Sequence, residues 1–175
     1  RHTRYGTVTG VQTCALPIYF CYWTPRGEEF PKGGAILTAD GRRTRHYDQA
    51  KRINADLKNF GPTLMHLTHL GTHRLRSSKP ELSILENHPI TAISEGDYLI
   101  GSFRHADGRR AVLIQNYQFA YTAWPTVQFD AALGQVLEVN PKTGKHELFV
   151  EDSPDMEGHQ VSLDAGEGRL FLLPK

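Results

Sequence analysis

Three histidines, His66, His69 and His73, stand three and four residues apart near the middle of the sequence. On a helix, side chains at these spacings share one face, and such a face can supply ligands to a zinc ion. Gly71, however, interrupts a helix before His73, and no acidic residue or cysteine stands close to the set. We therefore expect a polar helix surface here, and the sequence predicts neither a metal centre nor a cofactor.

A second candidate is an aromatic-rich stretch that contains Tyr117, Phe119, Tyr121 and Trp124. Exposed aromatic rings on a β-sheet protein can bind glycans by stacking on the C–H faces of sugars. More often such rings fill a core or an interface. We expect packing roles for these residues and keep glycan binding as the alternative.

Composition and charge exclude several classes of function. The chain has 175 residues, of which 39% are hydrophobic and 22% charged, and its formal net charge is +1. Those values are typical of a globular protein, and the low net charge argues against a nucleic-acid binder. No apolar run approaches the ~20 residues of a membrane span. No phosphate-cradling glycine loop, Ser-His-Asp order or Cys-His pair is visible. We expect neither nucleic acid nor membrane as a partner.

Residues 8–18 read VTGVQTCALPI, which matches the in-frame translation of a common sequencing adapter. Such a scar is set aside from fold reasoning, so we expect residues 1–18 to be unstructured and natural sequence to begin near Tyr19. Cys14 falls inside the scar. The remaining Cys21 predicts neither a disulfide framework nor a metal knuckle.

The helices that would position these groups follow from apolar spacing. Thr44 is a candidate N-cap, and apolar residues then recur at three- and four-residue steps from Tyr47 to Phe60, which predicts an amphipathic helix. Gly61 and Pro62 should end this helix. The leucines that follow predict a second short helix ending at Gly71.

Strands are expected on both sides of these helices. The apolar run 19–23, YFCYW, predicts a strand buried on both faces. Residues 72–94 show no clear periodicity and predict an extended connector. Short runs of β-forming residues follow at 98–104, 110–116, 122–129, 135–139, 146–150, 160–163 and 170–173. Asp107 and Gly108 predict a tight hairpin, residues 140–144 predict a longer one, and the whole predicts a β-sandwich-like domain.

The stretch YWTPRGEEFPKGGAILTADGRRTRHYDQAKRINADLKNFGPTLMHL resembles the end of the barrel in β-galactosidase-like glycoside hydrolases of the family 42 type and their relatives. In that pattern a Trp ends the eighth strand, a loop leads to A-I-L…D-G…T…Y, and a helix carries N-x-x-L-K…G-P-x-L. The residues that match here are Trp23, residues 35–37, Asp40, Gly41, Thr44, Tyr47, Asn54, Leu57, Lys58, Gly61 and Pro62. DYLIGSFRHADGRRAVLIQN and VSLDAGEGRLFLLP resemble the β-domain that follows the barrel. The resemblance covers nearly all of 19–175 and indicates a clan of sugar-cleaving barrels better than one family.

The resemblance implies an α+β fragment: the last βα unit of a TIM barrel at 19–71, a linker at 72–94 and an antiparallel β-sandwich domain at 95–175. The parent would hydrolyse O-glycosidic bonds of a carbohydrate substrate with two carboxyl groups. Family members carry these groups at the ends of the fourth and seventh strands, facing the βα loops. Since the chain begins at the eighth strand, we expect it to lack both and to be inactive alone.

Two further candidate groups are the pair Glu28 and Glu29, and the single residue Trp23. Glu28 and Glu29 would lie near the mouth of the barrel, but they are adjacent in a Pro/Gly loop, and nothing holds them about 5 Å apart as a retaining pair requires. We therefore assign no catalytic residue. Trp23 matches the family's eighth-strand Trp, which implies that it lines the sugar-binding subsite by stacking; packing against barrel neighbours is the alternative.

The main alternative function is a non-catalytic β-sandwich module that binds glycans or serves as an accessory domain. A third hypothesis is a complete small αβ protein unrelated to hydrolases. The upstream coding sequence would distinguish it from the hydrolase hypothesis. The sequence leaves open the sugar, the oligomeric state and the compartment, although relatives are often secreted or periplasmic.

Overall fold

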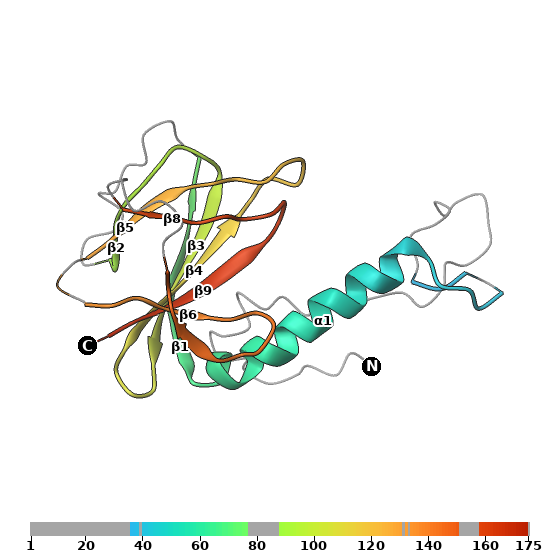
Figure 1. Ribbon diagram of the computed structural model, residues 1–175, viewed down its shortest axis with the longest axis horizontal. Coiled ribbons are helices and arrows are strands. Elements are labelled where there is room, and N and C mark those ends of the chain that lie inside the picture. Colours follow the sequence, from blue (N-terminus) through green and yellow to red (C-terminus); the bar gives the residue numbers. More distant parts are fainter. Residues whose placement is uncertain are drawn as a thin grey trace, which may run out of the picture.

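The computed structural model describes residues 36–38, 40–76, 88–130, 132, 134–150 and 158–174. Over these residues the protein is α+β, with one helix and two antiparallel sheets (Figure 1). The predicted strand at 19–23 lies outside the described residues, as do Trp23, Glu28, Glu29 and the adapter-like stretch. The structure therefore does not show the barrel unit. Two antiparallel sheets occupy the part of the chain where the sandwich-like domain was predicted.

The helix α1 (Arg45–Leu64) precedes all the strands. The larger sheet has the order β1 (Leu67–Leu75), β3 (Tyr98–His105), β4 (Arg110–Asn116), β9 (Gly168–Leu173), β6 (Leu137–Val139) and β7 (His146–Leu148). The smaller sheet has the order β2 (Ile90–Ile93), β5 (Thr126–Phe129) and β8 (His159–Gln160). Each predicted strand beyond residue 95 overlaps one of these strands, and both predicted hairpins are confirmed.

The central strands of the larger sheet, β3, β4 and β9, are buried on both faces. Ile100 and Phe171 point into a cluster shared with Ile90 and Val127 of the smaller sheet. On the opposite face a second cluster, which includes Phe103, Leu170 and Leu172, packs against Phe60 and Leu64 of α1. Alternate residues of β9 therefore enter different cores, which explains why this strand reads as a continuous apolar run.

Strand β1 changes the face that it buries halfway along its length. Leu67 belongs to the cluster beneath α1, whereas Leu75 belongs to the cluster between the sheets. The register with β3 shifts between His69 and Gly71, which leaves Leu70 outside the pairing and 56% exposed. Because side chains alternate along a strand, one extra residue exchanges the two faces. The bulge thus lets β1 contribute to both cores.

Two predictions about the helices were wrong. Thr44 does cap α1, because its side chain accepts from the backbone N–H of His46, but the helix runs through Gly61 and Pro62 to Leu64. Pro62 lacks the N–H that would donate to the carbonyl four residues earlier, but it lies in the last turn, so only a short part of the helix follows it. The predicted second helix is β1 instead, because pairing with β3 along the whole strand outweighs the local leucine spacing. The connector predicted at 72–94 includes the end of β1 and all of β2.

Candidate functional site between the helix and the larger sheet

A groove of about 770 Å³ separates α1 from the larger sheet. Its apolar lining comes from the helix and from the sheet beneath it, namely Ile53, Leu57, Phe60, Leu64, Leu113 and Leu170. Figure 1 shows that the C-terminal end of α1 lies against the larger sheet and that the rest of the helix extends away from it. Phe60 and Leu64 are packed on the core, whereas Ile53, two turns earlier, is 38% exposed.

The hairpin between β6 and β7 holds the anchored end of α1. The side-chain amide of Asn59 donates to the carbonyl oxygens of Pro141 and Lys142 at 2.7 and 2.8 Å. Gly144 in the same turn has φ of 70°, and a Cβ there would lie 2.5 Å from the Asn59 carbonyl oxygen. Only glycine fits this position, since it tolerates the left-handed conformation and the close approach of the helix. The hairpin therefore determines where the groove begins.

A partly buried contact between Thr63 and His146 supports this anchor. The Thr63 hydroxyl lies 2.8 Å from Nε2 of His146, and Thr63 is only 4% exposed. Burial lowers the pKa of His146 below its usual value, with Arg109 and His105 acting in the same direction and Asp107 opposing them.

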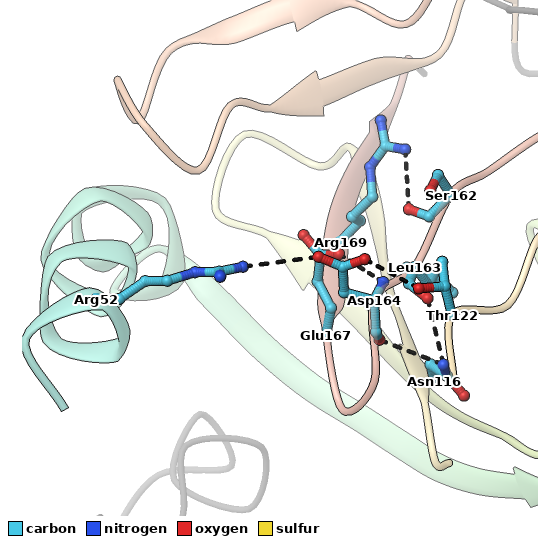
Figure 2. A network of polar contacts seen from close by, with 8 residues as sticks. All are labelled: Arg52, Asn116, Thr122, Ser162, Leu163, Asp164, Glu167 and Arg169. Atoms are coloured by element: carbon cyan, nitrogen blue, oxygen red, sulfur yellow. Dashed lines mark hydrogen bonds and ion pairs between the residues drawn. The ribbon is translucent and has the colours of Figure 1, made fainter. Parts of the chain in front are cut away.

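The polar side of the groove is acidic and is organised by one turn. The Asp164 carboxylate accepts from the Thr122 hydroxyl at 3.2 Å, and the Glu167 carboxylate accepts from the Asp164 backbone N–H at 2.7 Å. Arg52 reaches across from α1 to within 3.9 Å of Asp164 (Figure 2). Both members of this ion pair are largely exposed, so it contributes little to stability. Asp56 adds a third carboxylate from the helix.

Asn116 fixes the segments that form this polar side. It is completely buried, and its Nδ2 donates to the carbonyl oxygens of Leu163 and Asp164, both at 3.3 Å (Figure 2). The same Nδ2 donates to the carbonyl oxygen of Tyr121 at 3.0 Å. Its Oδ1 accepts from the backbone N–H of Gln118 at 3.0 Å. One side chain therefore ties the segment after β4 to the turn before β9. Nothing in the sequence distinguishes Asn116 from any polar residue at a strand end.

The aromatic stretch forms a loop, residues 117–125, at the end of the groove. Phe119, Tyr121 and Trp124 are 75%, 59% and 61% exposed, so the expected packing role does not describe them. Tyr121 also lines the groove. The ring of Phe119 lies beside Gly166, where a Cβ would be 3.5 Å from it, and Gly166 is another lining residue. The exposed rings of Phe119 and Tyr121 are therefore continuous with the groove.

Tyr117 behaves differently from its neighbours, as the packing role predicted. The Arg74 guanidinium stacks over its ring at 3.8 Å and donates to both carboxylate oxygens of Asp97 at 2.9 and 2.8 Å. The hydrogen bonds and charge of Arg74 hold the pKa of Asp97 below its usual value. Tyr117 thus helps to fasten the loop to β1 and is not a free platform.

The three histidines do not share a helix face. His69 and His73 lie on β1, and His66 lies just before it. His69 pairs with the Thr72 hydroxyl at 2.8 Å and packs edge-on against Phe103, while the His66 ring lies 5.7 Å from that of His105. Among the described residues, no group of three or more His, Cys, Asp or Glu side chains is placed to hold a metal ion.

The contact between His88 and Ser102 was not predicted from the sequence, and it stabilises the fold without a catalytic role. Nε2 of His88 lies 2.5 Å from the Ser102 hydroxyl, and the backbone N–H of Ile90 donates to Nδ1 at 3.1 Å. Because Nδ1 is the acceptor, the neutral ring carries its proton on Nε2 and donates it to the serine. Burial, with smaller effects from His73 and Arg110, lowers the pKa of His88 to about 4. A general base would need a lone pair facing the hydroxyl, so this pair does not activate a nucleophile.

Comparisons with protein-family models, with curated proteins and with solved structures find no match to this chain. In the part of the chain that the structure describes, no helix combines the length and the apolar character needed to cross a membrane. The interpretation of the groove therefore depends on its own geometry and on the sequence resemblance.

Proposed function

We propose that the chain is the C-terminal part of a glycoside hydrolase, namely the closing βα unit of a TIM barrel followed by an antiparallel β-sandwich domain. In this proposal the parent enzyme hydrolyses an O-glycosidic bond, and preceding strands carry its acid and its nucleophile. Trp23 would line the sugar-binding subsite by stacking.

The observation that carries the proposal is the way α1 meets the sheet. This helix bears the motif residues Asn54, Leu57 and Lys58, and it leads directly into β1 through a short turn. Only its C-terminal part packs on the sheet, and the remainder extends beyond it (Figure 1). A helix that closes a barrel would have this arrangement, since its N-terminal part must pack on the barrel.

None of the described carboxylates near the groove is assigned to catalysis. Glu167 accepts from a backbone N–H and Asp164 from a threonine hydroxyl, so both stabilise the turn that they belong to. A general acid needs a carboxyl whose pKa is raised by burial or by a neighbouring negative charge. Asp164 is exposed and pairs with the Arg52 guanidinium.

The proposal is tested by recovering the upstream coding sequence and assaying p-nitrophenyl β-galactoside hydrolysis. We expect the present chain to be inactive and the extended protein to be active. Replacing either glutamate at the ends of its fourth and seventh barrel strands with glutamine should abolish turnover. Hydrolysis by the present chain, or an upstream reading frame without such glutamates, would refute the proposal.

A second candidate function is glycan binding by the loop 117–125, and the exposure of its rings specifically favours it. Phe119, Tyr121 and Trp124 are exposed together on one loop, whereas core aromatics would be buried. Titration of oligosaccharides should show binding that Trp124→Ala abolishes. Leu148→Ala, at a 51% exposed apolar position on β7, is the control and should bind normally. Equal binding by the two variants would contradict this role.

A further inference from the structure

The groove beside α1 has the dimensions and the lining of a small-molecule site. Its volume of about 770 Å³ lies within the ~300–1,000 Å³ of typical ligand pockets. Leucines from both sides, Leu57 and Leu113, present an apolar surface, while Gln115, Thr122 and Asp164 bring polar groups to one side. A sugar ring offers the complementary combination of apolar C–H faces and hydroxyl groups around its edge.

The charges around the groove restrict the ligand further. Asp56, Asp164 and Glu167 carry negative charge into the lining, and Arg52 is the positive residue among the lining residues. Arg52 already lies beside Asp164, which leaves Asp56 and Glu167 without a cationic partner among the described residues. Carboxylates accept hydrogen bonds from hydroxyl groups but repel anions. The lining therefore suits a neutral saccharide and disfavours uronic or sulfated ones.

The groove is also the continuation of the aromatic loop. Tyr121 belongs to both, and Phe119 lies beside Gly166 at the end of the groove. A glycan stacked on the exposed rings would thus be directed along the groove. Asn116 holds the backbone of the loop and that of the 164–167 turn in one arrangement, so little ordering would be needed when a ligand binds.

We propose that this groove is a binding site for neutral oligosaccharides, extending the aromatic loop into a continuous cleft. The inference rests on the glycan-binding role proposed for the loop, and it adds the location and the charge class of the ligand. It does not require the chain to be part of a hydrolase.

The test is an NMR titration of the full chain with galactotetraose and, separately, with tetragalacturonic acid. Methyl resonances of Leu57 and Leu113 report on the groove, and the indole N–H that disappears in Trp124→Phe reports on the loop. Galactotetraose should shift both sets of resonances, and tetragalacturonic acid should shift neither. Anionic binding equal to or tighter than neutral binding would overturn the charge argument.

A matched pair of variants on α1 tests the groove itself. Ile53→Trp places a large ring in the groove and should weaken galactotetraose binding at least about tenfold. Ala55→Trp adds a ring at an exposed helix position that does not line the groove and should leave binding unchanged.

The outcomes separate the groove from the loop. If the Trp124 indole moves while the leucine methyls stay fixed, or if Ile53→Trp binds normally, the groove proposal fails and the loop proposal survives. If the methyls move without the indole, the groove binds the saccharide by itself, and both the continuous cleft and the loop proposal fail. No shift at either position would overturn both.

Discussion

Replacing Asn116 by aspartate should destabilise the protein, and more so as the pH rises. The amide nitrogen of Asn116 donates to three carbonyl oxygens inside the protein, those of Tyr121, Leu163 and Asp164. Aspartate has nearly the same shape but places an oxygen at that position. Its ionised form would face three carbonyl oxygens without a proton to donate, and only its protonated form could restore one hydrogen bond.

The loss of stability in Asn116→Asp depends on which of the three carbonyl groups keep another hydrogen-bond donor. The Leu163 and Asp164 carbonyls also accept backbone N–H groups, from Ala123 at 2.8 Å and Glu167 at 2.9 Å, so the loss falls mainly on the Tyr121 carbonyl. Leaving one buried polar group unpaired costs about 1–3 kcal/mol, and burying an unpaired carboxylate adds to this. We expect Asn116→Asp to lower the free energy of unfolding by about 4 kcal/mol at pH 8.

The direction of the pH dependence is fixed by the carboxyl group. Burial and the carbonyl dipoles should raise its pKa in the folded state above the unfolded value of about 3.9. The variant is then closest to the wild type below about pH 3.9, and it loses about 1.4 kcal/mol per pH unit until the folded pKa is reached.

The assay is urea unfolding of the wild type, Asn116→Asp and the exposed control Asn54→Asp at pH 5 and pH 8. The difference from the wild type at each pH removes the contribution of native histidines. Asn116→Asp should show a clearly larger deficit at pH 8, and Asn54→Asp should differ little from the wild type. A deficit below about 1 kcal/mol, or one that is equal at the two pH values, would refute the role given to Asn116.

Three further predictions concern the anchor, a buried histidine and a buried ion pair. Gly144→Ala should destabilise the protein by about 2 kcal/mol, because φ is positive and the new methyl would meet the Asn59 carbonyl oxygen. Chemical denaturation measures the loss of stability, and an unchanged unfolding midpoint would contradict the prediction. His88 has a folded pKa of about 4, below the usual 6.5, so its contribution to stability is present above pH 6.5 and is lost as the pH falls toward 4. In His88→Gln the stability should therefore change less between pH 7 and pH 5, and an identical pH profile would argue against burial of the ring. Arg169 donates to both carboxylate oxygens of Glu138 in a largely buried pair, so Arg169→Met should cost about 3 kcal/mol, and thermal unfolding near the wild-type temperature would show that the pair is dispensable.

Local signals in the sequence predicted local structure well. Thr44 caps α1 as expected because capping needs only its own side chain and the next turn of backbone. Asp107 and Gly108 form the predicted β3–β4 turn, with Gly108 at φ of 93°, because the turn conformation depends on those residues alone. The helix and the hairpins could therefore be predicted without any knowledge of the fold.

Structure that depends on distant partners could not be predicted in this way. Leu67 and His69 belong to a stretch with helical spacing, yet they pair with His105 and Phe103 of β3. The groove is a space between α1 and a sheet, and no sequence periodicity encodes the angle between them. The barrel strand and the role of Trp23 remain predictions, because both lie outside the described residues.

The sequence by itself determined the β-rich character of the C-terminal part, the start of α1 and the positions of its hairpins, since all of these depend on neighbouring residues. The tertiary structure decided which aromatic side chains reach solvent, how Asn116 joins two loops and where an acidic groove opens. These features depend on packing between segments far apart in the chain. Free energy from burying both faces of the central strands of the larger sheet overrides local preference there, and the groove remains where α1 leaves that sheet.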